Sequence, residues 1–178
     1  LPISTATEAN GGDTATVTAQ IPVTVTAVAD APSLTVAPAA GAEDSAIALN
    51  ITAALGDLDG SESLTVTIAG VPPGAVLSAG TDLGSGSWSL TETQLAGLTI
   101  TPAADSDADL TLTVTATATE ANGGDTATVT AQLPVTVTAV ADAPSLTVSP
   151  ASGAEDSAIA LNITAALGDL DGSESLTI

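Results

Sequence analysis

The chain contains a near-exact internal repeat. Residues 5–66 recur as residues 117–178, a shift of 112 positions, and four of these 62 positions differ, which leaves 58 identical. The differing pairs are conservative: Ile21/Leu133, Ala37/Ser149, Ala40/Ser152 and Val66/Ile178. Repetition at a fixed period is typical of arrays in which each unit contacts its neighbours. We therefore expect the C-terminal part of one repeat at 1–30, a complete repeat at 31–142 and the N-terminal part of a third at 143–178.

The charge of the chain is entirely negative. It has 21 Asp and Glu residues and no Lys, Arg or His, which gives a formal net charge of −21. No carboxylate can form a side-chain salt bridge, so repulsion has to be tolerated or neutralised from outside. Nucleic acids and anionic membranes bind through Lys and Arg, and we expect neither as a partner. Divalent cations are the expected partner.

High acidity is also found in salt-adapted and in disordered chains. Disorder requires low hydrophobicity, whereas 44% of these residues are apolar and they alternate regularly. Salt adaptation scatters acidic residues over the surface, whereas here they gather in a few short loops. This distribution favours specific ion binding. No apolar run is long enough to cross a bilayer, so we expect no membrane contact by this segment.

Alternation of apolar and polar residues dominates the pattern. Within 110–120 every second residue from Leu110 to Ala118 is Leu, Val or Ala with Thr between, and 125–140 continues the alternation. A period of two indicates strands with one buried face. The intervening Glu120–Asp125 loop is rich in Asn and Gly and predicts a hairpin. Pro134 interrupts the second run, which predicts an edge strand with a bulge.

Further strands are expected at 33–38, 46–55, 63–69, 75–78, 88–91 and 98–102. Pro72–Gly74 and the Gly/Ser stretch at 84–87 separate some of them. About seven short strands in 112 residues, with no helical period, predict an all-β fold, a β-sandwich with Greek-key connections.

The acidic residues of the complete repeat fall mainly in loops. Glu43-Asp44 follows the first expected strand, Asp57-Leu58-Asp59-Gly60-Ser61-Glu62 follows the second, and Asp105-Ser106-Asp107-Ala108-Asp109 precedes the 110–120 strand. Asp-x-Asp spacing in a loop lets two carboxylates turn toward one point, as Ca²⁺ with its 6–8 oxygen ligands requires. Asp57-x-Asp59-Gly60 begins like an EF-hand loop, but the Glu at the twelfth position is missing and no helices flank it.

These motifs resemble the bacterial cadherin-like, or immunoglobulin-like, repeats of giant RTX adhesins from biofilm-forming Gram-negative bacteria. Ala42-Glu43-Asp44 resembles the family's Pro-Glu-Asn, and Asp57-Leu58-Asp59-Gly60-Ser61-Glu62 resembles its Asp-x-Asp loop. The strand ending in Glu120 resembles one that ends in a ligand Asp, and Val140-Ala141-Asp142-Ala143-Pro144 resembles its inter-repeat linker. The resemblance spans the whole chain and implies tandem cadherin-like Greek-key sandwiches with Ca²⁺ at the linkers.

The resemblance also implies a set of metal ligands. At the complete junction these are Glu43, Asp105, Asp107 and Asp142 with Asp169 and Asp171 of the next repeat; at the upstream junction they are Asp30, Asp57, Asp59 and Glu120. Asp44, Glu62 and Asp109 rank below them. The linker has Ala where the family has its first Asp and its Asn residues, which implies fewer or weaker ions at each junction.

Several residues have an ordinary interpretation beside a functional one. Trp88, the only aromatic residue, either fills the core or stacks on a sugar, and we favour the core. The Thr ladders either bind a regular lattice or simply face solvent, as we expect. Asp82 and Glu92 are assigned to solvent, and Asn122 and Asp125 to the hairpin turn.

The sequence thus predicts a calcium-stiffened extender of an extracellular adhesin on a bacterial surface. Its role is to hold a distal ligand-binding domain away from the cell. Catalysis is not expected, because His, Cys, Lys, Arg and Tyr are absent and only a carboxylate pair would remain. The alternatives are a repeat that itself binds carbohydrate or an identical repeat, and an acidic spacer that is independent of calcium.

Overall fold

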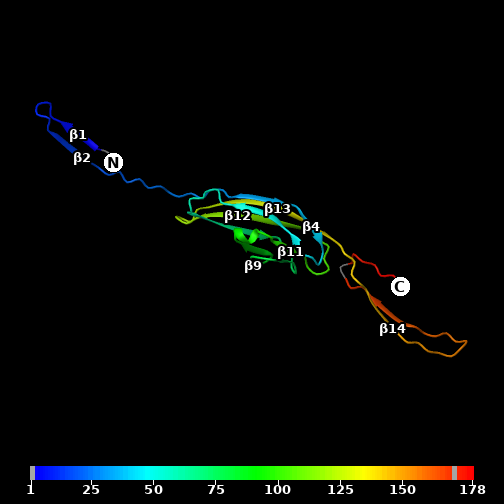
Figure 1. Ribbon diagram of the computed structural model, residues 1–178. Coiled ribbons are helices and arrows are strands. Elements are labelled where there is room, and N and C mark those ends of the chain that lie inside the picture. The colour runs from blue at the N-terminus through cyan, green and yellow to red at the C-terminus, as the bar shows by residue number, and fades with distance from the viewer. Residues whose placement is uncertain (1–2, 170–171) are drawn as a thin grey trace.

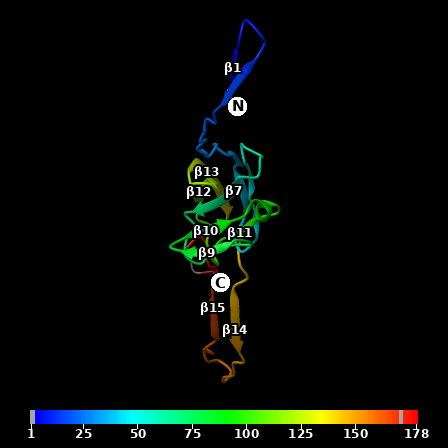
Figure 2. The same ribbon diagram turned by 90° about the vertical axis from the view of Figure 1, so that its left-hand side faces the viewer.

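The computed structural model describes residues 3–169 and 172–178. It has a central body of β-strands with a separate two-stranded hairpin beyond each end (Figure 1, Figure 2). The first hairpin pairs β1 (Ile3–Thr7) with β2 (Thr14–Thr18), and the last pairs β14 (Ser145–Ser149) with β15 (Asn162–Ala166). The molecule is therefore elongated, and the body corresponds to the complete repeat.

One layer of the body is a six-stranded sheet. Its order is β4 (Ala39–Ala42), β13 (Thr126–Thr138), β12 (Leu110–Glu120), β7 (Glu62–Ala69), β10 (Ser87–Leu90) and β9 (Thr81–Gly84). All neighbours are antiparallel except β4 and β13, which run parallel. The long central strands hold the sheet together, and the loops that carry the acidic clusters extend from their ends.

The second layer consists of two small sheets. One pairs β3 (Ser33–Ala37) with β6 (Asn50–Ala54), and the other has the order β5 (Ile47–Ala48), β11 (Thr99–Thr101) and β8 (Val76–Leu77). A single 3₁₀ turn, η1 (Glu92–Leu95), connects β10 to β11. Apolar side chains from both layers form one hydrophobic cluster, so the body is a sandwich of two layers.

The core is built almost entirely from aliphatic side chains. Val66, Ile68, Val114 and Ala116 are fully buried, whereas the Thr residues between them lie on the other face of the sheet. Successive residues of a strand point to opposite faces, so the period-two pattern assigns each strand its buried side. The expectation of an all-β fold with sandwich layers agrees with this architecture.

The strands expected from the sequence are found, but one of them is divided and three short segments were not expected. The predicted strand at 110–120 is β12, with the same bounds, whereas the single strand expected at 46–55 is divided into β5 and β6. Leu49 lies between them, and its N–H donates to the Leu98 carbonyl at 2.9 Å. The short segments β4, β9 and η1 were not predicted, because Ala, Gly and Asp give little periodicity or strand propensity.

The prediction of a bulge at Pro134 is wrong. The residues from Leu110 to Thr119 pair with those from Val135 back to Thr126 without a shift. β13 gains its second neighbour, β4, only from Val135 onward. Up to Pro134, β13 pairs with β12 on one side and forms an edge of the sheet on the other. Pro134 has no N–H, but at this position no second strand lies beside it to accept a hydrogen bond.

The terminal hairpins carry apolar side chains that are exposed to solvent. Leu146 and Val148 of β14 are each 65% exposed, whereas their counterparts Leu34 and Val36 in β3 pack against the core. The repeat sequence thus forms the same strand pairing where the rest of the sandwich is absent. Burial of these side chains depends on the strands that the complete repeat supplies.

Replacing the buried Leu112 with Ala tests the core. We expect Leu112→Ala to lower the free energy of unfolding by about 2–5 kcal/mol, because it removes buried methyl groups and leaves a cavity. Thr136→Ala, at an exposed position of β13, should change it by less than about 0.5 kcal/mol. Denaturant unfolding followed by Trp88 fluorescence measures both, and equal effects would contradict the assignment of faces.

Candidate metal centre

Three carboxylates meet at one end of the body. Asp44 follows β4, Asp105 precedes β12, and Asp142 lies in the linker between β13 and β14. One carboxylate oxygen from each lies within 4.8 Å of those of the other two. Asp44 and Asp142 are exposed and Asp105 is half-buried. The group can hold a metal ion, because it combines three anionic oxygen donors with access from solvent.

Unusual backbone conformations bring the first two members together. Asp44 has φ 55° and Asp105 has φ 56°, in the left-handed region that Asp adopts more readily than most residues. The Asp105 N–H donates to Asp44 Oδ1 at 3.1 Å, which joins two loops 61 residues apart. The two loops are therefore fixed to each other without a cation.

Glu43 fixes the chain that leads to Asp142. Its side chain is 3% exposed, its N–H donates to the Thr138 carbonyl at 3.1 Å, and its Oε1 accepts from the Val140 N–H at 2.6 Å. Asp109 acts in a similar way, because its Oδ1 accepts from the Val137 N–H at 2.9 Å. These two acids hold the end of β13 and the start of the linker rather than joining the group of three.

The linker is also held by the repeat that follows it. The Asp142 N–H donates to Glu174 Oε1 at 2.5 Å, and at the upstream linker the Asp30 N–H donates to Glu62 Oε1 at 2.6 Å. These bonds are 112 residues apart, so the repeat encodes the same junction twice. The second carboxylate oxygen of both Glu62 and Glu174 is buried and has no hydrogen-bond partner among the described residues.

Glycine allows this close approach of loop and linker. A Cβ added at Gly56 would lie 2.8 Å from the Ala31 carbonyl oxygen, and one at Gly168 would lie 3.1 Å from that of Ala143. Each linker therefore lies directly against the loop after the second strand of the next repeat.

The Asp-x-Asp loop of the complete repeat is closed by its own backbone. Asp57 Oδ1 accepts from the Asp59 N–H at 2.9 Å, and Asp59 Oδ1 accepts from the Ser61 N–H at 2.7 Å. Glu120, 3% exposed, accepts from the Ser61 hydroxyl at 3.0 Å and the Asn122 N–H at 3.2 Å. Such side-chain-to-backbone bonds are typical of Asp in turns.

Asp125 has a role that the sequence did not reveal. Its carbonyl accepts from the Glu120 N–H, as expected for the hairpin, but its Oδ2 also accepts from the Ala29 N–H at 3.1 Å. This bond joins the β12–β13 hairpin to the upstream linker, 96 residues away. No local pattern distinguishes a turn Asp from one that also binds a distant backbone.

The residues implied by the family resemblance are distributed over several environments. Asp105 and Asp142 belong to the group of three, together with Asp44, which had ranked lower. Asp107 is exposed and outside the group. Asp169 is 2% exposed and accepts from the Ser173 hydroxyl at 3.5 Å, and Asp171 lies outside the described residues. Within the described part of the chain, Asp30, Asp57, Asp59 and Glu120 form no comparable group.

No protein-family model, curated protein or solved structure matches the chain. In the part of the chain that the structure describes, no helix has the length and apolar character to cross a membrane.

The hydrogen bonds of the loop that contains Asp59 and Ser61 predict how the Asp59 carboxyl titrates with acid. The Ser61 hydroxyl, for whose one proton Asp59 competes with Glu120, and then the Ser61 N–H hold the pKa of the Asp59 carboxyl below its ordinary value of 3.8. Because the fold favours the ionised form, its contribution to stability is present above pH 3.8 and is lost as the pH falls through the lower, folded-state pKa.

We expect Ser61→Ala to raise the pKa of Asp59 toward 3.8, since the larger of the two favourable bonds is removed. Ser63→Ala, whose hydroxyl donates to the Thr119 carbonyl instead, should leave it unchanged. Carbon-detected NMR titration of the Asp59 carboxyl measures both. An unaltered midpoint in Ser61→Ala would show that the hydroxyl does not act on Asp59.

Proposed function

We propose that this chain is an extender segment of an extracellular bacterial adhesin, stiffened by Ca²⁺ at the linkers between repeats. One observation carries the proposal: the group of three carboxylates combines two loops of one repeat with a linker residue whose N–H is bound by the next repeat. An ion at Asp44, Asp105 and Asp142 would fix the linker to the body of its own repeat, and the bond from the Asp142 N–H to Glu174 would carry that restraint to the next repeat.

Calcium suits this donor set better than other common metals. His and Cys are absent, which removes the ligands that favour zinc and copper. Ca²⁺ accepts several carboxylates in an irregular arrangement, whereas Mg²⁺ keeps most of its water and demands octahedral geometry. Extracellular calcium modules bind with Kd of about 10⁻⁴–10⁻³ M, which matches an exposed site of three carboxylates.

The strand arrangement supports a cadherin-like or immunoglobulin-like repeat. The first strand is divided: β3 pairs with β6 in one layer, and β4 crosses to pair in parallel with the last strand, β13, in the other. Crossing between layers by the first strand is compatible with Greek-key sandwiches of this class. It supports the family resemblance seen in the acidic motifs.

The proposed mechanism begins with charge. Three neighbouring carboxylates repel one another, and each pair of charges about 4 Å apart costs about 1 kcal/mol in water and more near a protein surface. Without the ion, this repulsion would favour conformations in which the Asp142 side chain lies away from Asp44 and Asp105. With the ion, the repulsion becomes attraction, the linker is fixed to the body, and the array becomes a stiff rod.

The proposal is tested by the shape of the chain in solution. Small-angle scattering should give a larger maximum dimension and less flexibility in millimolar Ca²⁺ than with a chelator. The melting temperature should also rise with Ca²⁺, because an ion at about 1–10 times its Kd stabilises the folded form by about 0.4–1.4 kcal/mol.

The variant Asp105→Asn tests whether Ca²⁺ binds at this site or responds only to the net charge of the chain. It removes one ligand charge but keeps the N–H that donates to Asp44, and it should weaken Ca²⁺ binding about tenfold or more in calorimetry. Glu92→Gln removes the same charge from η1, outside the group of three, and should bind like the wild type. If Ca²⁺ changed neither shape nor melting temperature, the chain would be an acidic spacer that needs no metal.

A further inference from the structure

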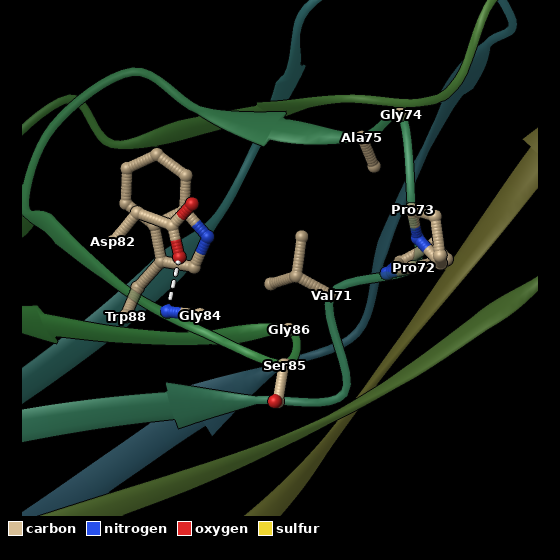
Figure 3. A pocket seen from close by; sticks show the side chains of 10 residues that line it. All are labelled: Val71, Pro72, Pro73, Gly74, Ala75, Asp82, Gly84, Ser85, Gly86 and Trp88. Atoms are coloured by element: carbon tan, nitrogen blue, oxygen red, sulfur yellow. Dashed lines mark hydrogen bonds between the residues drawn. The ribbon is translucent and has the colours of Figure 1, made fainter.

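A second site lies at the open edge of the sandwich, in the complete repeat. A hollow of about 500 Å³ is bordered by the segment that leaves β7 and by the β9–β10 hairpin (Figure 3). Its wall includes Val71, Pro72, Asp82 and Trp88. None of these residues belongs to the acidic loops described above.

A β-bulge brings a carboxylate to the tryptophan. In the β9–β10 pair Ser87 lies opposite Gly84, but Trp88 lies opposite Asp82, so the register shifts by one residue. Without that shift Leu83 would face Trp88; instead Leu83 is 61% exposed. Directly opposite residues have their side chains on the same face, and bulges redirect side chains in this way beside functional sites.

Hydrogen bonds and close packing hold the β9–β10 turn and the wall of the hollow in place without a ligand. The two residues of the turn, Ser85 and Gly86, have φ of 54° and 73°, as a tight hairpin requires. The Gly86 carbonyl accepts from the Val71 N–H at 3.1 Å, and a Cβ on Gly86 would lie 2.3 Å from the Val71 carbonyl oxygen. Asp82 Oδ1 accepts from the Gly84 N–H at 2.8 Å, and its other oxygen has no hydrogen-bond partner among the described residues.

Trp88 has one side in the core and one side on the hollow. It lies opposite Ile68, which is fully buried and itself lies opposite Val114, so all three share the inner face of the sheet. The indole packs against the core but is only half-buried, and it lines the hollow next to the Asp82 carboxylate (Figure 3). The expected core role of Trp88 therefore accounts for only part of its surface.

We propose that this hollow binds an organic ammonium group, such as the methylated or free ammonium of a small molecule or of a partner's lysine side chain. The face of an indole attracts cations, an adjacent carboxylate adds an ionic partner, and the net charge of −21 raises the local concentration of cations. Pro72 and Pro73 have no N–H and contribute apolar surface for methyl or methylene groups.

The donor content of the wall favours a cation over a sugar. Sugar hydroxyls require hydrogen-bond donors as well as acceptors, but no Asn, Gln, Lys or Arg side chain lines the hollow, and its side-chain donors are the Trp88 indole N–H and the Ser85 hydroxyl. The one side-chain hydroxyl, that of Ser85, points away from the indole in Figure 3. An ammonium needs acceptors and a π face, and Asp82 and Trp88 supply both.

Fluorescence of the single Trp tests the proposal directly. With the full chain at fixed Ca²⁺ and fixed ionic strength, titration with choline should change Trp88 emission in a saturable way, with a Kd in about the millimolar range. The uncharged analogue 3,3-dimethylbutan-1-ol, sodium chloride and glucose should give no saturable change. A response to the neutral analogue as strong as that to choline would overturn the ammonium assignment, and a saturable response to glucose alone would reassign the hollow to sugars.

Asp82→Asn is the decisive variant. The Asn oxygen can still accept from the Gly84 N–H, so the turn should be retained, which an unchanged melting temperature would verify. Choline binding should weaken on the order of fivefold or more, whereas Glu92→Gln, with the same loss of charge elsewhere, should leave it unchanged. Equal weakening by both variants, or no weakening by Asp82→Asn, would contradict the site.

Discussion

The absence of any cationic side chain determines how this protein uses its carboxylates. With no Lys, Arg or His in the chain, backbone N–H groups, and in places a Ser hydroxyl, become their partners. Glu43, Glu62, Glu174 and Asp125 each accept from an N–H of a linker residue. A backbone bond to an ionised acceptor is stronger than one between neutral groups. The acids therefore position the junctions without any bound ion.

The sandwich places these acids at the ends of its strands. Glu120 ends β12 and Glu62 begins β7, and the two lie opposite each other in the sheet. Glu43 follows β4, whose parallel pairing with the end of β13 brings it beside the linker. The alternating apolar residues thus determine more than the core: by fixing the register of long central strands, they determine which loops meet at each end.

The sequence was sufficient for features that depend on local pattern. The period of two predicted β12 and the buried faces, and the family resemblance implied metal ligands at Asp105 and Asp142, which the structure places in one group with Asp44. The sequence places Asp44 below the other candidate metal ligands. Its position in the group depends on a left-handed backbone conformation and on a hydrogen bond to a loop 61 residues away, and neither can be predicted from a local pattern. For the same reason, the sequence did not predict the contact of Asp125 with the linker or the pairing of Asp82 with Trp88. Each depends on register between distant or bulged strands, which no single segment encodes.

The junction combines a linker backbone held by hydrogen bonds with a group of three neighbouring carboxylates, and this combination is compatible with the proposed switch in stiffness. The Asp142 N–H is held by Glu174 and the preceding Val140 N–H by Glu43, so the linker backbone is held from both sides. These two bonds restrain the linker but leave the Asp142 side chain exposed, and an ion shared with Asp44 and Asp105 would add a third restraint on the angle between the units. Little conformational entropy is then lost when an ion binds, because most of the ordering is already present. In the proposed function, a weak site of three carboxylates would therefore control the geometry between two large units, and the repeat reproduces the same linker bond 112 residues earlier at Asp30 and Glu62.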